Sequence, residues 1–214
     1  MIKSYLLPPA WFPPVLYFVF VSAAHEVVIE VQDTYPKQTL RNRCTILTAH
    51  GPLNLTIPVS KPVGSKTKTD EIRTHENKDW PNKHWRAIQS AYNKSPYFIH
   101  YSETIKEVIF SNQDKITELC LQSIESMLSI LKINANITFT SEFKTINPTL
   151  IDARNFDQFS SALSSHEYPE YTQVFSDRLR FQPNLSIIDL VSNLGPKSAS
   201  YISRIAELIQ DKQF

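Results

Sequence analysis

The sequence predicts an α/β fold with a central mixed sheet, a βαβ-like N-terminal opening, a β-hairpin, and helices largely in the C-terminal two-thirds. Near the N-terminus, two short, mainly apolar runs enclose a helical stretch, and the second run is rich in β-branched residues. Such runs are typical of strands buried on both faces of a parallel sheet. Two further β-rich runs flank a turn, and amphipathic helical patterns follow them. At 214 residues, we expect residues 1–214 to form a single domain.

The βαβ-like opening consists of three elements. Residues Ile2–Leu7 are predicted to form a short buried strand that breaks at a pair of prolines. Residues Val15–Ala24 are predicted to form a helix entered through a second proline pair, because proline is tolerated at the first helical position. Residues Glu26–Val31 are apolar and β-branched, so they predict a second buried strand.

The hairpin is predicted from the next two β-rich runs. These are Arg43–Leu47 and Leu53–Val59, and the intervening Ala-His-Gly-Pro of residues 49–52 supplies turn chemistry. After them, Lys61–Thr69 contains Gly64 and several lysines, and we expect it to be a flexible loop.

Three helices are then expected. The first spans Pro81–Asn93 and the second Tyr97–Phe110, with a break at Pro96, because the residue before proline avoids the α region. The third, Gln113–Leu131, has the best amphipathic stripe in the chain. The apolar positions of that stripe, which we expect to be core, are Ile116, Leu119, Cys120, Ile124, Met127, Leu128 and Leu131.

The C-terminal part combines a strand, a loop and two helices. Residues Ile137–Phe143 alternate like a strand, and Asn147–Glu170 is polar with weak periodicity, which favours a long surface loop. A short helix is expected from Ser186 to Leu194, because its start resembles a capping box and Gly-Pro follows it. A last helix, Ser198–Gln210, presents an apolar face made of Tyr201, Ile202, Ile205, Leu208 and Ile209.

Composition excludes several functional classes. The three glycines, Gly51, Gly64 and Gly195, are too far apart for a Walker A loop or a G-x-G-x-x-G turn. A net charge of +1 argues against nucleic acid as a partner. Cys44 and Cys120 are widely separated, which fits a reducing compartment and gives no zinc pattern. We therefore expect no metal and no cofactor.

The N-terminal apolar stretch resembles a secretory signal, but four prolines interrupt it. Residues Val15–Ala24 number only ten, whereas a membrane-spanning helix needs about twenty. We therefore expect an uncleaved N-terminus, no membrane span and a cytoplasmic protein.

A cationic cluster follows the second predicted strand. It contains Tyr35, Lys37, Arg41, Asn42 and Arg43. Because ligands of open α/β sheets lie beyond the carboxyl ends of the strands, these cations could clamp a phosphate or carboxylate. The alternative is a solvated loop. Any anion site in this chain must use lysine, arginine and a helix start in place of glycine.

Two carboxylates also lie near the end of that strand, and a histidine lies at a helix start. Glu30 and Asp33 could serve as acid, base or metal ligands, although such pairs often arise by chance. His84 and Trp80 lie near the start of the first long helix, where backbone N–H groups and the helix dipole favour an anion. A hydrogen-bonded structural role for His84 is the alternative. No serine lies in G-x-S-x-G and Cys44 has no adjacent base, so acyl-enzyme chemistry has no specific support.

The order of these segments resembles the WbqC-like family of bacterial proteins, in a Bacteroidetes-type branch. The matching segments span almost the whole chain and comprise Pro9–Pro13 with Tyr17-Phe18, Tyr35-x-Lys37 with Asn42-Arg43, Leu55–Val59, Asp79-Trp80 with His84-Trp85, Ala91-Tyr92 with Pro96–Phe98, and Asn184–Leu190 with Gly195-Pro196. Two positions depart from the better-known branch. Pro8 stands where Gln usually precedes the first proline, and Leu16 stands where Gly usually precedes the tyrosine.

The resemblance implies a role in surface-polysaccharide or O-antigen assembly, with transfer of an aminoacyl group to a sugar as a suggested reaction. The first hypothesis is therefore a cytoplasmic transferase that binds an activated sugar, nucleotide-sugar or other small phosphorylated metabolite. In it, the phosphate is bound by Lys37 and Arg43, the substrate is oriented by Asn42, and His84 acts as general acid or base. Tyr35 and Trp80 stack on the ligand.

Two other hypotheses remain. The chain could be a non-catalytic binding or scaffolding subunit that works with biosynthetic partner proteins, since it lacks a nucleophile or metal constellation. The strand–loop–helix–strand opening also resembles nucleotidylyltransferases. Their H-x-G-H loop is missing, because the corresponding loop here has neither His nor Gly.

Overall fold

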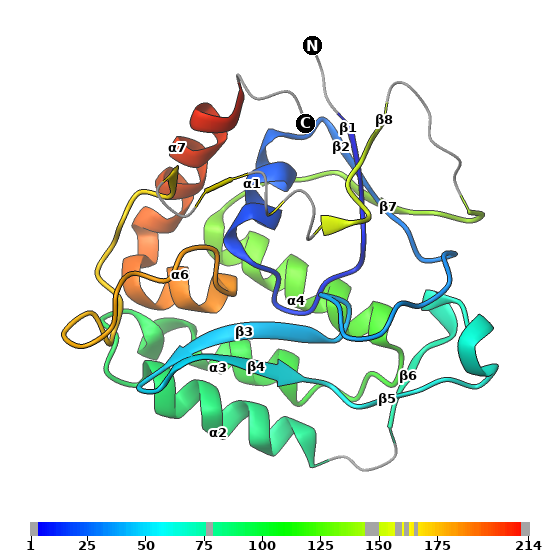
Figure 1. Cartoon of the computed structure of the whole chain (residues 1–214), viewed down its shortest axis with the longest axis horizontal. Coiled ribbons are helices and arrows are strands. Elements are labelled where there is room, and N and C mark those ends of the chain that lie inside the picture. The colour runs from blue at the N-terminus through cyan, green and yellow to red at the C-terminus, as the bar shows by residue number, and fades with distance from the viewer. Residues whose placement is uncertain are drawn as a thin grey trace.

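A four-stranded parallel sheet combines two strands from the N-terminal part of the chain with two strands from residues 137–152 (Figure 1). The computed structural model describes residues 4–75, 79–143, 150–156, 160, 163–164 and 167–210. The strand order is β7-β2-β1-β8, and every neighbouring pair is parallel. The strands are β1 (Ser4–Leu7), β2 (Glu26–Ile29), β7 (Ile137–Phe139) and β8 (Leu150–Asp152).

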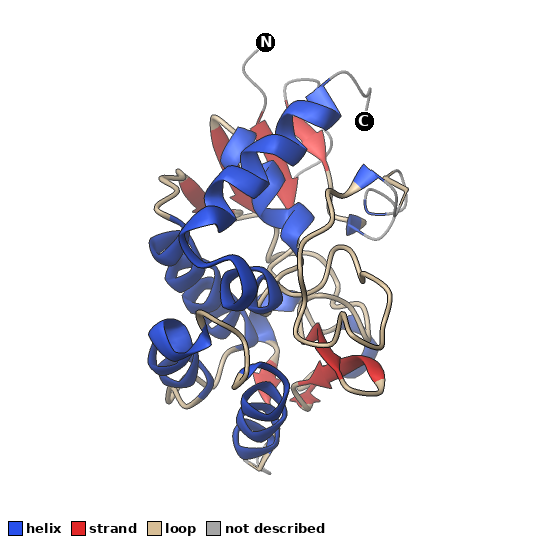
Figure 2. Cartoon of the chain, turned by 90° about the vertical axis from the view of Figure 1, so that its left-hand side faces the viewer, coloured by secondary structure: helices blue, strands red, loops and turns tan. Residues whose placement is uncertain are grey.

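The predicted βαβ opening is confirmed, although residues 2 and 3 of its first strand lie outside the described residues. Helix α1 (Val15–Ala23) connects β1 to the parallel strand β2, and its residues 15–21 are all buried. Helix α7 (Ser198–Gln210) packs against α1, as both cartoon views show (Figure 2). The backbone N–H of Leu16 donates to Oδ1 of Asn184 at 2.9 Å. The distant C-terminal part of the chain therefore helps to cap the first helix.

The predicted hairpin is also confirmed, with its second strand ending earlier than expected. Strands β3 (Arg43–Thr48) and β4 (Gly51–Thr56) pair antiparallel from Thr48↔Gly51 to Arg43↔Thr56. The expected continuation to Val59 is wrong, because Pro58, which has no N–H to donate, follows the end of β4. Antiparallel pairing thus occurs in sheets separate from the parallel one.

A second small antiparallel sheet was not expected from the sequence. Strand β5 (Val59–Ser60) pairs with β6 (Arg73–Thr74). Between them, the segment predicted as a flexible loop contains two 3₁₀ turns, η1 (Gly64–Lys66) and η2 (Thr69–Glu71).

The predicted helices are present within about three residues of their expected ends. They are α2 (Trp80–Tyr92), α3 (Phe98–Ile109), α4 (Ile116–Leu131), α6 (Ile187–Leu194) and α7, with the 3₁₀ turn η4 (Gly195–Lys197) before α7. Every residue of the predicted α4 stripe is buried. On α7 the apolar face is buried except at Leu208, which is exposed, so that expectation is wrong at one position.

The expected surface loop over residues 147–170 is wrong in one important part. Residues Leu150–Asp152 form β8, which pairs with β1 at the edge of the parallel sheet. A strand of three residues is too short to produce a period-two pattern, so nothing local distinguishes it from a loop. The preceding strand is also shorter than predicted, since β7 ends at Phe139.

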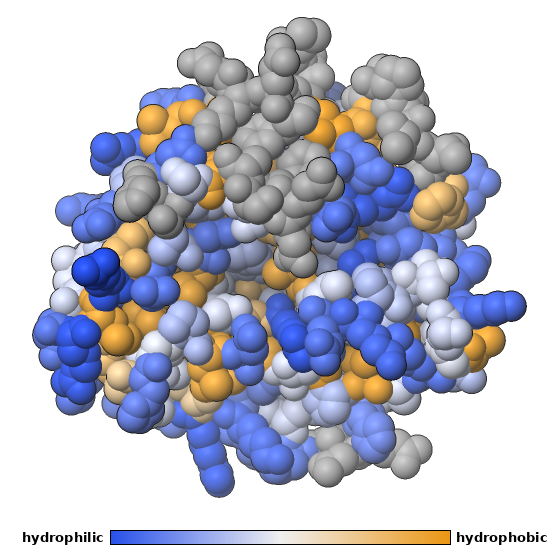
Figure 3. All heavy atoms as spheres, in the orientation of Figure 1, coloured by the Kyte–Doolittle hydropathy of each residue, from blue (hydrophilic) through white to orange (hydrophobic). Residues whose placement is uncertain are grey.

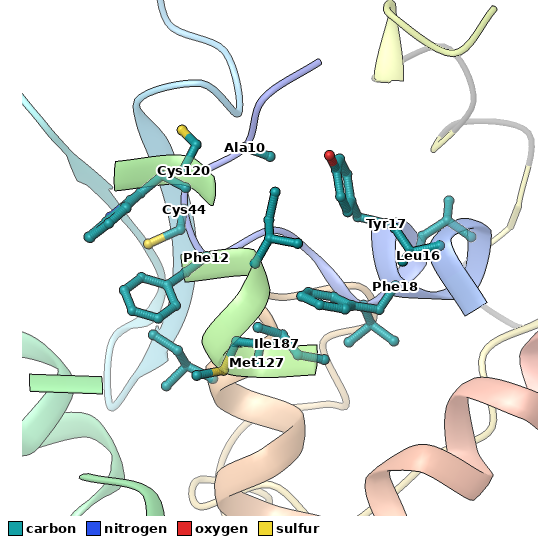
Figure 4. Packing of buried hydrophobic residues seen from close by; sticks show 14 of the residues in the cluster. Ala10, Phe12, Leu16, Tyr17, Phe18, Cys44, Cys120, Met127 and Ile187 are labelled. Carbon is teal, nitrogen blue, oxygen red and sulfur yellow. The ribbon is translucent and has the colours of Figure 1, made fainter. Parts of the chain in front are cut away.

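The hydrophobic core joins the loop after β1 to the β3–β4 hairpin and to helices α4 and α6. Phe12 of the loop, Cys44 of β3, Met127 of α4 and Ile187 of α6 lie together in it (Figure 4). The view in Figure 3 shows a mostly hydrophilic face on which hydrophobic side chains occur in small separate groups. Helices predominate in the C-terminal two-thirds of the chain, so the predicted α/β class is confirmed.

Candidate functional site

A cavity of about 360 Å³ lies where the strands of the parallel sheet end. Each strand is followed by a segment that contributes to the cavity, which is where ligands bind in open α/β sheets. The residues that line it are Pro8 after β1, Asp33, Pro36, Thr39, Leu40 and Arg41 after β2, Phe143 after β7, and Arg154, Asn155 and Phe156 after β8.

The first charged pair of the cavity joins Asp33 to Arg41. Nη2 of Arg41 lies 2.5 Å from Oδ2 of Asp33, and the hydroxyl of Thr69 donates to Oδ1 of Asp33 at 2.5 Å. Both carboxylate oxygens are therefore used, and the carboxylate cannot rotate without breaking one of these bonds.

The second charged group centres on Arg154. Its Nε and Nη2 donate to the two oxygens of Asp152 at 2.9 and 2.6 Å, and Nη1 lies 3.5 Å from Oε2 of Glu30. The guanidinium also lies 4.9 Å from the centre of the Phe143 ring. The bidentate bond lowers the pKa of Asp152 and raises the pKa of Arg154.

Glu30 lies beneath this group and is completely buried. Its Oε1 accepts hydrogen bonds from the Thr140 hydroxyl at 2.7 Å and from the Gln32 backbone N–H at 2.8 Å. A buried carboxylate is stable only when it is hydrogen-bonded and paired, and these contacts meet that need. Glu30 therefore fixes the ends of β2 and β7 beneath the cavity.

The six predicted site residues are not among those that line this cavity, and most of them are buried. Tyr35, Asn42, Trp80 and His84 are buried, Arg43 is half-buried, and Lys37 is exposed. The Asn42 side chain donates to the Ile57 carbonyl at 2.9 Å, so one half of its amide has a structural role.

Tyr35, Arg41 and Arg43, all from the predicted cationic cluster, are close enough for the two charges to act on the tyrosine. Burial raises the pKa of Tyr35, and the nearby charges of Arg41 and Arg43 oppose that rise. The ammonium of Lys61, a residue not selected from the sequence, lies 4.7 Å from the Tyr35 ring centre. Arg41 also lines the cavity. It therefore connects the cavity with the predicted cluster.

His84 lies among aromatic rings. Its ring centre is 5.0 Å from that of Trp80 and 6.4 Å from that of Trp11. Burial lowers the pKa of His84 to about 4, and the backbone of Thr56 opposes this shift. Neither ring nitrogen has a hydrogen-bond partner of normal geometry among the described residues. At neutral pH the imidazole is uncharged. Thr56 pairs with Arg43 in the hairpin, so His84 and Arg43 share a neighbour.

Buried polar atoms without partners concentrate in this region. Among the described residues, thirteen such side-chain atoms occur, and eight of them belong to Trp11, Tyr35, Thr39, Arg41, Asn42, Arg43 and His84. A buried polar atom without a partner costs roughly 1–3 kcal/mol, so such atoms usually have an explanation in bound water or ligand.

Sequence reasoning missed Asp152, Phe143 and Arg154. Phe143 follows β7, Asp152 is the last residue of β8, and Arg154 follows β8. The segment that contains β8 has the pattern of a polar loop, which concealed them. Glu30 and Asp33, the candidate acids, bases or metal ligands of the sequence, both lie at the carboxyl edge. Within the described residues, no three histidine, cysteine, aspartate or glutamate side chains are placed to hold a metal ion.

An open parallel sheet with flanking helices and a charge-lined cavity at its carboxyl edge defines a protein of the open-sheet α/β class. The chain belongs to the WbqC-like protein family, whose family model matches residues 8–152 and 146–201. It is similar to the uncharacterized protein Rv1507c of Mycobacterium tuberculosis (strain ATCC 25618 / H37Rv), with 22% identity over 211 residues that cover 87% of this chain and 91% of that protein. No solved structure matches the chain.

The two departures from the better-known branch fall in different environments. Pro8 lines the cavity. Leu16 is completely buried in α1. Among the described helices, none is long and apolar enough to cross a membrane.

Proposed function

We propose that this single-domain protein is a cytoplasmic transferase of surface-polysaccharide or envelope biosynthesis. Its substrate would be an activated sugar or another small phosphorylated metabolite, and the transferred group would be an aminoacyl group. The main support is the concentration of partnerless buried polar atoms in Tyr35, Asn42, Arg43 and His84, four of the residues selected from sequence. A polar ligand in this region would supply the missing hydrogen bonds.

Each residue has a role in this proposal. Arg43 and the exposed Lys37 bind phosphate oxygens, and the unpartnered Oδ1 of Asn42 orients a ligand hydroxyl or amine. His84 is uncharged at neutral pH because burial lowers its pKa to about 4, so it would act as a general base. Tyr35 and Trp80 would provide ring faces for stacking.

The ligand would also extend into the cavity at the carboxyl edge. Arg41 lines that cavity, and its charge is close enough to influence the pKa of Tyr35. A substrate larger than one ring could therefore occupy the cavity and the predicted cluster at the same time.

Thermal unfolding with nucleotide-sugars tests the proposal. At a ligand concentration 100-fold above the Kd, stabilisation is about 2.7 kcal/mol, which raises the Tm of a chain of this size by about 5 °C or more. The double substitution of Lys37 and Arg43 by alanine should abolish this shift. The matched control replaces Lys106 and Arg178, two exposed cations elsewhere, and should retain it. An unchanged shift in the Lys37 and Arg43 variant would refute the assignment of the phosphate contacts.

The alternative is a binding or scaffolding subunit without chemistry that works with biosynthetic partner proteins. The two cysteines favour this alternative, because neither is a ready nucleophile. Both are buried, and burial raises the pKa of each thiol. Under this alternative, ligands stabilise the protein but purified protein alone turns none of them over. Product formation in a metabolite screen by mass spectrometry would exclude it.

A further inference from the structure

The charged groups of the carboxyl-edge cavity are already paired with each other. Asp33 is bonded to Arg41, and Arg154 is bonded to Asp152 and Glu30. Three carboxylates thus surround two guanidinium groups. A phosphate in the cavity would meet an excess of negative charge.

Most of the remaining wall of the cavity is apolar. It consists of Pro8, Pro36, Leu40, Phe143 and Phe156, with Thr39 and Asn155 as the polar members. Such a wall suits the C–H faces of a ring, and the paired charges of Asp33, Arg41 and Arg154 offer donors and acceptors within the same lining. Hydroxyl groups can both donate and accept, so they can bond to a carboxylate and a guanidinium without separating the pair.

We infer that this cavity binds an uncharged, hydroxyl-bearing ring, the glycosyl part of a larger ligand whose phosphate lies at Lys37 and Arg43. The identity of the larger ligand rests on the proposed function, whereas binding of the ring rests on the cavity alone. At about 360 Å³, the cavity is near the lower end of the range of roughly 300–1,000 Å³ for ligand pockets. It accommodates a single ring more readily than a whole nucleotide-sugar.

Ligand-observed NMR with free monosaccharides tests this inference. The probes are D-glucose, D-galactose, N-acetyl-D-glucosamine and L-rhamnose, each titrated to about 50 mM. Saturation should transfer from the full-length protein to the ring protons of at least one of them. Because that ligand is uncharged, its Kd should be the same within about twofold at about 50 mM and about 500 mM NaCl. Inorganic phosphate should not compete with it.

Two phenylalanines from neighbouring positions provide a matched pair of variants. Phe143 is 55% exposed and lines the cavity, so Phe143→Ala should weaken saccharide binding about fivefold without disturbing the core. Phe139 on β7 is 42% exposed and does not line the cavity, so Phe139→Ala should leave the Kd unchanged.

Several results would overturn the inference. They are the absence of saturation transfer to all four sugars, binding that weakens with salt or is displaced by phosphate, or an equal effect of the two phenylalanine variants. Failure of the proposed function would give a different experimental result. In that case a free sugar still binds in a manner that depends on Phe143, whereas nucleotide-sugars produce no thermal shift that depends on Lys37 and Arg43.

Discussion

Arg41 and Asp33 form an ion pair with an N–O distance of 2.5 Å at the carboxyl edge of the sheet, and their side chains are only 4% and 16% exposed. Because Arg41 is almost completely removed from water, loss of its partner leaves an uncompensated charge. The pair also positions the loop after β2, since the same Asp33 carboxylate accepts a hydrogen bond from Thr69.

Removal of this partner should destabilise the fold. We expect Asp33→Ala to lower the free energy of unfolding by about 2–3 kcal/mol, somewhat below the value for fully buried pairs because Asp33 is partly exposed. Urea denaturation measures the change. The control is Asp177→Ala, which breaks an exposed pair with Arg178 and should cost at most about 0.5 kcal/mol. Equal losses in the two variants would show that the Asp33 pair is not structural.

His84 should make stability depend on pH. Burial lowers its folded pKa to about 4, whereas the unfolded pKa is about 6.5. Between these values the unfolded chain binds more protons, so stability is highest above pH 6.5 and falls as the pH decreases towards 4. The difference between the folded and unfolded pKa corresponds to at most about 3 kcal/mol.

The histidine effect can be isolated by substitution. His84→Gln should flatten the decline in unfolding free energy between about pH 7 and about pH 4, measured by urea denaturation at several pH values. His100→Gln, which alters an exposed histidine, should keep the wild-type profile. A His84→Gln profile parallel to wild type would contradict the lowered pKa.

Gly195 should tolerate no side chain. Its φ is +53°, and a Cβ atom there would overlap the ring of Tyr97. We expect Gly195→Ala to cost about 2–4 kcal/mol, from backbone strain together with overpacking. Gly64 is the control, because its φ is +63° but no atom lies within 4 Å of the place that a Cβ would occupy, so Gly64→Ala should cost only about 1 kcal/mol.

A second substitution distinguishes the two causes at Gly195. Tyr97→Ala in the Gly195→Ala background removes the ring that the new methyl group meets, so part of the loss should be recovered in a double-mutant cycle. Strict additivity of the two losses would mean that the contact with the ring has no effect.

Ser123 should hold the proline-rich loop in place. Its hydroxyl accepts from the Phe12 backbone N–H at 3.1 Å and lies within hydrogen-bond reach of the Ala10 carbonyl, while Phe12 has a φ of +37°. We expect Ser123→Ala to lower the unfolding free energy by about 1–2 kcal/mol, because a buried N–H loses its partner. Ser129→Ala, at an exposed position of the same helix, should change it by less than about 0.5 kcal/mol. Denaturation curves that coincide for the two variants would contradict this role.

Local sequence patterns were sufficient to predict the longer helices. The apolar stripe of α4 predicted a buried helix face correctly, and Pro96 separated α2 from α3 as expected. Short elements without such patterns were missed, as β8 and β6 illustrate. The sequence placed Tyr35, Asn42, Arg43 and His84 among the candidates, and their roles as binding or catalytic groups stay predictions.

The sequence alone determined the α/β class, the positions of the helices, the family and the absence of glycine-rich phosphate loops. These depend on local periodicity, proline positions and residue types, which can be read without tertiary contacts. Only the tertiary structure decided that Arg154 pairs with Glu30, 124 positions away, and that the three-residue strand β8 brings it there. Pairing of strands distant in sequence depends on contacts that no local pattern contains. The carboxyl-edge cavity therefore could not be predicted from the sequence.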